Sequence, residues 1–291
     1  MRTLPAILCF AALSVSSQHH AASAADVAPP AVVAHRGLLL DAPENTLANF
    51  IACLHLRIGF EFDVRRTRDG ALICLHDATV DRTTDGKGHC SDFSLAELQR
   101  LDAGSWFSAE YRGQSIPTVD ALFQLIAAHQ VVGLYTVDLK ADDAELERDV
   151  VRLAVRHGIL DRLLFIGRAI DQADVRKRLR ATDLHCHVAA LANNRAELAR
   201  AVAEPDADWV YLRFVPTPAD IAAVRAAGKK SFLAGKTVAG LEQANWSEAT
   251  KAGVDGILTD HALVCRRLVS IPPREATKRA EASSTVKQPA P

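Results

Sequence analysis

The sequence has no excess of basic residues, because its 34 lysines and arginines are matched by 35 acidic residues, for a formal net charge of −1. Proteins that bind nucleic acid use surplus positive charge to neutralise phosphates, so nucleic acid is not an expected partner. Beyond the N-terminal region, no apolar run approaches the roughly 20 residues that cross a bilayer. We therefore expect no transmembrane segment, and the sequence does not predict an oligomeric state.

Cysteine is sparse, with 6 residues in the chain, and the five that follow the N-terminal region have no short or regular spacing. This pattern predicts neither a zinc site nor a dense disulfide framework. We expect most of them to be small buried apolar side chains, and a single bridge stays an open alternative. The five are Cys53, Cys74, Cys90, Cys186 and Cys265.

The N-terminal region has the pattern of a signal peptide. Arg2 precedes a short apolar stretch, residues 4–15, and small residues at 22–24 fit a cleavage site. The stretch is too short to span a bilayer, which disfavours the alternative of a retained membrane anchor. We therefore expect residues 1–24 to be a signal peptide and the mature protein to be exported, either periplasmic or secreted.

Strand-like apolar runs alternate with helical periodicity through the rest of the chain. Eight such repeats predict an α/β protein, a (β/α)8 TIM barrel over residues 31–269. A doubly wound open sheet is the alternative, but no glycine-rich dinucleotide motif follows the first strand. The expected strands are residues 31–34, 60–64, 131–139, 163–166, 185–189, 209–214, 231–234 and 255–259. The expected helices are residues 46–57, 122–129, 144–157, 174–180, 195–202, 219–227, 243–252 and 261–269.

Two stretches depart from this alternation. An Asp-Gly turn signal at residues 67–70 predicts a hairpin whose return arm is residues 71–75. Residues 78–117 are polar and rich in turns, and we expect them to form a small insertion after the second strand that lies over the active face. Residues 271–291 contain mainly polar residues and proline, which predicts a disordered tail.

Carboxylates gather where the predicted strands end. Glu61 and Asp63 are two residues apart, so both side chains lie on one side of their strand. Asp138 lies at the end of the next barrel strand. A divalent cation offsets the repulsion between such carboxylates, and all-oxygen ligands favour Ca²⁺ or Mg²⁺. Solvated carboxylates at a strand edge are the alternative interpretation.

Two histidines and two cationic side chains join the carboxylates as candidate site residues. His35 and His76 follow strand-like runs and form a candidate acid–base pair, because imidazole changes charge near neutral pH. The Arg36 guanidinium matches phosphate oxygens, and Lys140 is a second candidate phosphate contact or an ion-pair partner of a carboxylate. This inventory suits metal-assisted cleavage of a small-molecule phosphodiester.

The loop after the first strand adds Glu44 and Asn45. Both are candidate ligands of the metal or of substrate hydroxyls. Capping of the following helix is the alternative role of Asn45.

In this order, these residues resemble the glycerophosphodiester phosphodiesterase family. The resemblance implies a (β/α)8 barrel with an insertion after the second strand. It also implies a cation held by Glu61, Asp63 and Asp138, acid–base roles for His35 and His76, and release of glycerol 3-phosphate and an alcohol. The motifs that carry it are His35-Arg36-Gly37, Glu44-Asn45-Thr46, Glu61-Phe62-Asp63-Val64, His76-Asp77, Asp138-Leu139-Lys140 and Asp255-Gly256-Ile257-Leu258-Thr259-Asp260.

The sequence departs from the family pattern at two places. The third-strand acid is commonly Glu, whereas Asp138 is one methylene shorter, so we expect its metal contact to pass through water. The family often has a Trp-Thr motif at the seventh strand, whereas residues 233–237 read Leu-Ala-Gly-Lys-Thr. We therefore expect an aromatic wall beside the glycerol to be missing.

Two alternative functions stay open. A phospholipase D-like enzyme on the same barrel would act on lysophospholipid or sphingomyelin, with Trp106, Phe107 and Tyr111 lining an apolar approach to the site. A barrel that has lost catalysis would serve as a binding module, although His35 and His76 are both present.

Overall fold

The computed structural model describes residues 28–129, 133–235 and 241–270. The predicted signal peptide (1–24) and the predicted tail (271–291) lie outside these residues. Within the described ranges, no helix has both the length and the apolar character needed to cross a membrane.

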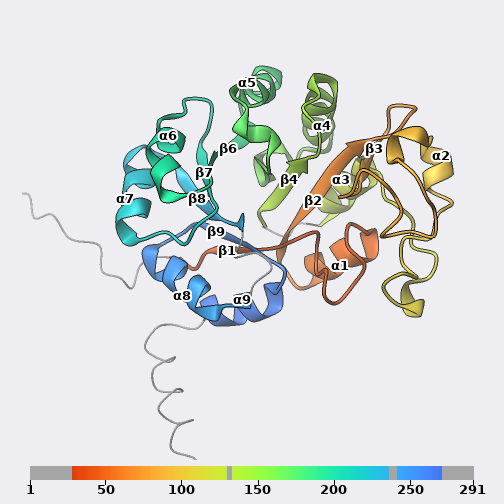
Figure 1. Ribbon diagram of the computed structural model, residues 1–291, viewed down its shortest axis with the longest axis horizontal. Coiled ribbons are helices and arrows are strands. Elements are labelled where there is room, and N and C mark those ends of the chain that lie inside the picture. Colours follow the sequence, from red (N-terminus) through yellow and green to blue (C-terminus); the bar gives the residue numbers. More distant parts are fainter. Residues whose placement is uncertain (1–27, 130–132, 236–240, 271–291) are drawn as a thin grey trace, which may run out of the picture.

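Eight parallel strands form a closed barrel, which confirms the predicted (β/α)8 fold (Figure 1). The strands follow one another around the barrel as β1-β2-β4-β5-β6-β7-β8-β9, and pairing of β9 with β1 closes it. Their bounds are β1 Ala31–Ala34, β2 Gly59–Arg66, β4 Tyr135–Leu139, β5 Leu163–Ile166, β6 His187–Ala192, β7 Trp209–Leu212, β8 Lys230–Leu233 and β9 Gly256–Thr259.

Helices connect successive strands on the outside of the barrel (Figure 1). Several of these helices have an N-cap residue whose side chain accepts a hydrogen bond from a backbone N–H of the first turn. These N-cap residues are Thr46, Thr118, Asp143 and Thr217. Their apolar faces pack on the strands in one continuous core. Their bounds are α1 Leu47–His55, α3 Val119–Ala128, α4 Ala144–His157, α5 Ala173–Thr182, α6 Leu198–Ala203, α7 Pro218–Ala226, α8 Gln243–Ala252 and α9 Ala262–Val269.

Strand boundaries differ from the sequence prediction by one or two residues at β2, β7, β8 and β9, and by more at β6 and β4. β6 begins at His187 rather than at 185, because the Asp183 carboxylate accepts the His185 backbone N–H and holds a turn there. β6 then continues to Ala192, where pairing with β7 extends it. β4 begins at Tyr135, and residues 131 and 132 of the predicted strand lie outside the described part of the chain.

The predicted hairpin and insertion both exist. Strand β3 (Leu72–Cys74) runs antiparallel to β2, outside the barrel. The insertion contains helix α2 (Leu95–Leu98) and packs with β3 around its own apolar cluster. The members of that cluster are Ile73, Leu75, Val80, Cys90, Leu98, Ala103 and Ile116.

The five cysteines of the described chain are buried and free. Burial raises the pKa of the Cys53 thiol to about 12, which keeps it protonated at neutral pH. Their predicted role as small apolar side chains is therefore confirmed, and the open alternative of a disulfide bridge finds no pair among the described residues.

Candidate functional site

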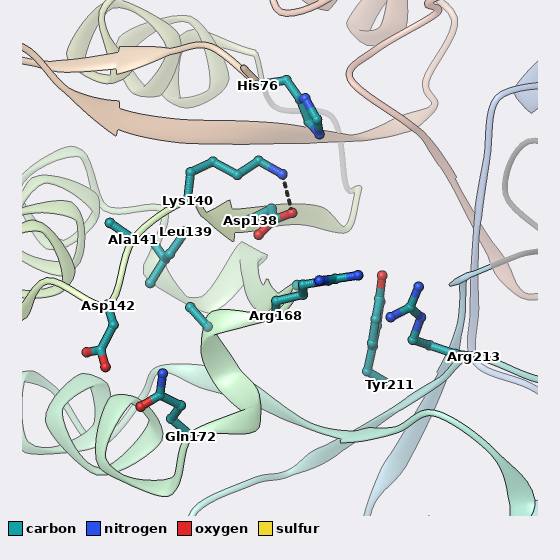
Figure 2. A pocket seen from close by; sticks show the side chains of 12 residues that line it. His76, Asp138, Leu139, Lys140, Ala141, Asp142, Arg168, Gln172, Tyr211 and Arg213 are labelled. Carbon is teal, nitrogen blue, oxygen red and sulfur yellow. Dashed lines mark hydrogen bonds and ion pairs between the residues drawn. The ribbon is translucent and has the colours of Figure 1, made fainter. Parts of the chain in front are cut away.

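A cavity of about 500 Å³ opens at the carboxyl ends of the barrel strands. Its wall includes His76, Asp138 and Lys140 (Figure 2), three of the residues that the sequence singled out. In (β/α)8 barrels this end is built from loops that follow the strands, so residues far apart in the chain meet there.

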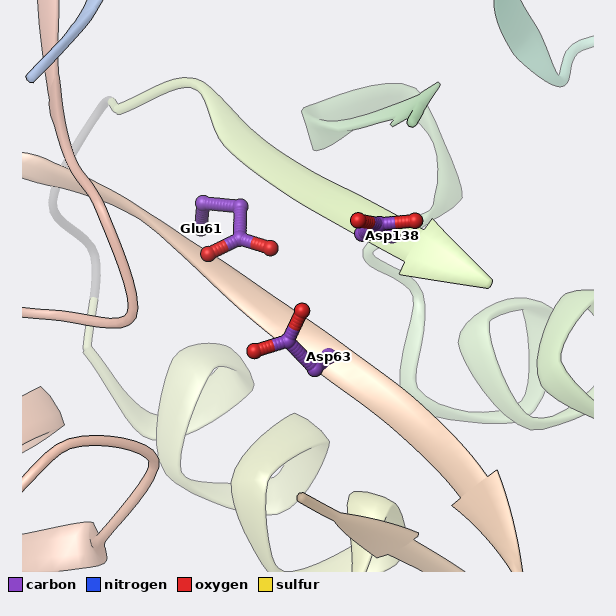
Figure 3. A group of neighbouring side chains, drawn as sticks. All are labelled: Glu61, Asp63 and Asp138. Atoms are coloured by element: carbon purple, nitrogen blue, oxygen red, sulfur yellow. The ribbon is translucent and has the colours of Figure 1, made fainter. Parts of the chain in front are cut away.

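Three carboxylates lie together beside this cavity. Glu61 and Asp63 extend from β2 and Asp138 from β4, where Asp63 and Asp138 are directly paired residues (Figure 3). One oxygen of each carboxylate lies within 4.8 Å of the others. The predicted acid cluster is therefore present.

Burial and neighbouring charged groups shift the pKa values of these carboxylates. Glu61 and Asp63 are 1% and 0% exposed. Burial and the neighbouring Asp63 raise the pKa of Glu61 well above its ordinary value, and burial likewise raises the pKa of Asp138. Burial would also raise the pKa of Asp63, but its interactions with Lys140, His76 and Arg36 outweigh this effect and the pKa is lowered.

Both predicted phosphate-binding cations touch this cluster. The Lys140 ammonium lies 2.7 Å from Asp63 Oδ1 and 2.5 Å from Asp138 Oδ2. Burial would lower the pKa of Lys140, but the carboxylates around it raise it to about 12. The Arg36 backbone N–H donates to Glu61 at 2.8 Å, and its Nε lies 3.8 Å from Asp63 Oδ2. The ion-pair interpretation of Lys140 therefore describes the arrangement seen here.

The acid cluster fits a hard divalent cation. It offers only oxygen ligands, and its three carboxylates outnumber the two cationic side chains, Lys140 and Arg36, that lie against them. The backbone leaves room for Asp138: a Cβ built on Gly167, which has φ +94°, would lie 2.0 Å from Asp138 Oδ1. Glycine at 167 therefore makes space for this carboxylate.

The two histidines are held in the same way. Nδ1 of His35 lies 2.6 Å from Asp260 Oδ1, and Nδ1 of His76 lies 2.6 Å from Asp77 Oδ1. A carboxylate at Nδ1 fixes the ring and leaves Nε2 as the nitrogen that can exchange a proton with a ligand. Burial lowers the pKa of His76, and the nearby carboxylates of Asp63 and Asp77 only partly offset this effect.

The hairpin brings His76 back to the mouth of the barrel. The Leu75 backbone N–H donates to the Asp63 carbonyl at 3.1 Å, which places the next residue beside the acid cluster. His35 follows β1 directly, one residue before the Arg36 amide that binds Glu61. The histidines thus reach the site from two different segments.

Asn45 supports Asp63 and does not cap α1. Its Nδ2 donates to Asp63 Oδ2 at 2.8 Å, and its Oδ1 accepts the Asp63 backbone N–H at 3.2 Å. The helix cap is Thr46, whose side chain accepts the Asn49 backbone N–H. Of the roles left open for Asn45, the structure therefore supports a contact with a candidate metal ligand.

Glu44 is occupied by two arginines. Its carboxylate accepts from Arg36 at 3.1 Å and from two nitrogens of Arg82, each at 2.8 Å. Burial would raise the pKa of Glu44, but the two guanidinium groups outweigh it and the pKa is lowered. Arg82 also donates to Asp77 at 2.7 Å, so it links Glu44 to the carboxylate that holds His76.

Several residues of this site were not predicted from the sequence. Asp260 closes the last motif of the resemblance, which is the signal that could have assigned it to His35. Arg82 has no such signal, because it lies in the irregular insertion. The sequence analysis also missed Arg168, Tyr211 and Arg213, which line the far side of the cavity (Figure 2).

Comparison with known proteins agrees with the barrel. The chain belongs to the glycerophosphoryl diester phosphodiesterase family, which it matches over residues 35–264. It is 48% identical over 96 residues to the glycerophosphodiester phosphodiesterase of Caldanaerobacter subterraneus, an alignment that covers 33% of this chain and 40% of that protein. The chain spans about half or less of the length of such curated relatives.

Two solved structures share the fold over most of the chain. A glycerophosphodiester phosphodiesterase from Agrobacterium tumefaciens has a TM-score of 0.69 and 25% identity, and the match covers 83% of this chain and 100% of that one. A phosphodiesterase from Oleispira antarctica, solved with the product sn-glycerol-3-phosphate, has a TM-score of 0.67 and 27% identity. That match covers 84% of this chain and 98% of the other.

The two departures from the family pattern have different outcomes. Asp138, despite its shorter side chain, brings an oxygen within 4.8 Å of the other two ligands. The region after β8 is described only to Gly235, so the predicted loss of an aromatic wall falls partly outside the described residues. Tyr211 from β7 does contribute an aromatic ring to the cavity.

Proposed function

We propose that the protein hydrolyses glycerophosphodiesters to glycerol 3-phosphate and an alcohol, which makes it a phosphoric diester hydrolase. One observation carries this proposal: a cluster of three carboxylates, two of them buried, lies with two carboxylate-paired histidines at one end of the barrel. Membership of the family and the product complex of the Oleispira antarctica relative support it further.

The histidines divide the proton transfers between them. The lowered pKa of His76 keeps its imidazole neutral at pH 7, so Nε2 can accept a proton from the nucleophile or return one to the leaving alkoxide. His35, oriented by Asp260, serves as the second group of the pair. Cleavage of a phosphodiester needs one proton removed and one delivered, and two imidazoles meet both needs.

The cationic side chains, and a divalent cation held by the carboxylates, would neutralise negative charge on the phosphate. Arg36 and Lys140 lie where they can donate to phosphate oxygens. Glu61, Asp63 and Asp138 would hold a divalent cation, Ca²⁺ or Mg²⁺, which when bound neutralises charge on the phosphate. Asn45 orients Asp63 by hydrogen bonds to its side chain and its backbone.

The direct test is release of glycerol 3-phosphate from glycerophosphoethanolamine by the purified protein, followed with a coupled dehydrogenase. We expect EDTA to abolish turnover and Ca²⁺ or Mg²⁺ to restore it. The His76→Ala variant should lose at least about 100-fold in kcat. The matched control is His185→Ala, since the side chain of His185 is 87% exposed and pairs only with Asp183. Turnover that is unaffected by EDTA would refute the cation, and wild-type turnover of His76→Ala would refute the acid–base pair.

The lipid-directed alternative depends on the aromatic residues of the insertion. Phe107 lies 5.7 Å, ring to ring, from both Trp106 and Tyr111, and the Tyr111 hydroxyl donates to the Asp41 carbonyl at 3.1 Å. These contacts favour a packing role, although Trp106 is 38% exposed. Faster turnover of lysophospholipid or sphingomyelin vesicles than of soluble diesters would favour the phospholipase D-like alternative. Binding of diesters without turnover would favour the binding module.

Export is a separate part of the proposal. The N-terminal pattern predicts cleavage near residue 24, and N-terminal sequencing of protein recovered from the periplasm or medium tests it. Recovery of intact chain from the cytosolic fraction would contradict export.

A further inference from the structure

The far wall of the cavity carries positive charge. Opposite His76 and Lys140, the wall is formed by residues that follow β5 and β7 (Figure 2). Arg168 comes two residues after the end of β5, and Arg213 directly follows β7. Their guanidinium groups point toward the Tyr211 hydroxyl from two sides (Figure 2). Three hydrogen-bond donors therefore converge on one part of the cavity.

The acidic residues of the cavity do not neutralise these arginines. Asp138 is paired with Lys140, and the Asp142 carboxylate accepts from Arg178 at 2.5 Å. Among the described residues, Arg168 has no ion pair or hydrogen bond from its side chain. Arg213 donates only to the neutral Asn193 amide, at 3.3 Å. The far wall of the cavity thus offers two guanidinium charges to a ligand.

Arg213 and Tyr211 are fixed in place. A Cβ built on Gly235, which has φ +78°, would lie 2.7 Å from Arg213 Cβ, so the chain after β8 packs directly on this arginine. Tyr211 is buried, with 8% exposure. Burial and the carboxylates of Asp138 and Glu61 raise the pKa of Tyr211, which keeps its hydroxyl a donor. Tyr211 and the base of the Arg213 side chain are therefore held beside the cavity.

We propose that this wall selects diesters whose alcohol carries a second anionic group, a carboxylate or a further phosphate. The inference rests on the proposed function, because the scissile phosphate is assumed to lie at the acid cluster and the alcohol to extend toward Arg168 and Arg213. A quaternary ammonium such as choline is recognised by several aromatic faces. Tyr211 is the single aromatic residue of the cavity wall as described, and it lies between two cations.

Two substrates that differ by one carboxylate test this selectivity. Glycerophosphoserine and glycerophosphoethanolamine share the glycerol phosphate and the ammonium group. We expect kcat/KM to be about tenfold higher for the serine diester, the factor typical of one charge-assisted hydrogen bond. Glycerophosphoglycerol with and without a terminal phosphate forms the second pair and distinguishes phosphate from carboxylate. Both preferences should shrink as salt is raised from 0.05 M to 0.5 M.

Substitutions in the wall test whether its arginines cause the preference for the serine diester. Arg168→Gln and Arg213→Gln should each lower the serine-to-ethanolamine ratio severalfold. Arg152→Gln is the matched control, because this exposed arginine of α4 lines a different surface depression and its loss changes net charge equally. We expect its ratio to equal that of the unaltered protein. A ratio near 1 for both substrate pairs, or a ratio unchanged in both wall variants, would overturn the inference.

A binding measurement separates this inference from the proposed function. Titration calorimetry of the His76→Ala variant with the same two diesters reports selectivity without turnover. Tighter binding of the serine diester by about tenfold supports the positively charged wall even if the unaltered protein hydrolyses neither compound, in which case only the proposed function fails. Equal binding of the two diesters contradicts the wall whatever the turnover.

Discussion

Replacing Gly167 by alanine is the sharpest test of where the structure places Asp138. Gly167 has φ +94°, and an added Cβ would lie 2.0 Å from Asp138 Oδ1 and 2.5 Å from Asp138 Cγ. Both separations are far shorter than any normal contact, so the carboxylate or the backbone must move. The substitution therefore combines backbone strain with displacement of a candidate metal ligand.

The two contributions can be estimated separately. An alanine in the left-handed region costs about 1–2 kcal/mol, and forcing atoms into a filled space costs about 1–3 kcal/mol. Together they predict a loss of about 3 kcal/mol in the free energy of unfolding. For a domain of this size that loss lowers Tm by about 6–12 °C.

Gly158 supplies the matched control. It ends α4 with φ +66°, and a Cβ built there has nothing within 4 Å. Gly158→Ala should therefore show the backbone cost alone, about 1 kcal/mol, at the lower end of the cost of a left-handed alanine. Thermal and urea unfolding of Gly167→Ala and Gly158→Ala, measured side by side, isolate the steric part as the difference between them.

Activity and a double variant complete the experiment. Because a shift of about 1 Å in a reacting group can cost on the order of 100-fold, we expect Gly167→Ala to lose about that factor in kcat and Gly158→Ala to keep its turnover. In an Asp138→Ala background the obstructing carboxylate is gone, so adding Gly167→Ala should cost only about 1 kcal/mol. If Gly167→Ala were as stable and as active as Gly158→Ala, the placement of Asp138 against Gly167 would be wrong.

Two further predictions concern the carboxylates that support the site. The pKa values of Glu44 and Asp77 lie below their ordinary values because Arg82 binds both, so their contribution to stability is complete above about pH 5 and is lost as the pH falls. Arg82→Gln should therefore lose less stability between pH 5 and pH 3 than the unaltered protein, by urea unfolding. Asp260→Asn should lower kcat at least about 100-fold with little change in KM, because it no longer stabilises protonated His35.

Controls for these two variants lie elsewhere on the surface. Arg68→Gln removes an arginine whose partner, Glu97, is itself 43% exposed, so the acid-induced loss of stability should stay close to that of the unaltered protein. Asp183→Asn removes the carboxylate beside the exposed His185, and kcat should not change. An Arg82→Gln variant with the full acid sensitivity of the parent, or an Asp260→Asn variant with normal kcat, would contradict the assigned contacts.

The sequence predicted the barrel and the acid cluster because both follow from local periodicity. Alternating apolar runs specify strands and helices, and two carboxylates at i and i+2 must share a face of a strand. Glu61 and Asp63 are therefore placed by their own strand alone. Asp138 required one further inference, that the next barrel strand pairs beside it, and the register confirms this pairing.

The contacts that were missed are long-range contacts. Arg82 meets Glu44 38 residues away, and His35 meets Asp260 225 residues away. The residues around an arginine or aspartate in the sequence do not indicate which distant group its side chain contacts. Arg168 and Arg213 are similar cases, since each follows an ordinary barrel strand, and only closure of the barrel brings them to one cavity.

The position of His76 depends on the insertion as well as on the barrel. Strand β3, which carries the chain to His76, contributes Ile73 to the apolar cluster of the insertion and Cys74 to the barrel core. From the same insertion, Arg82 binds Asp77, the carboxylate that holds the ring of His76, and it also binds Glu44 in the loop after β1. One guanidinium thus joins the segment that carries His35 to the segment that carries His76. The acid cluster lies on barrel strands β2 and β4, whereas the contacts around the second histidine also involve Arg82 from residues 78–117.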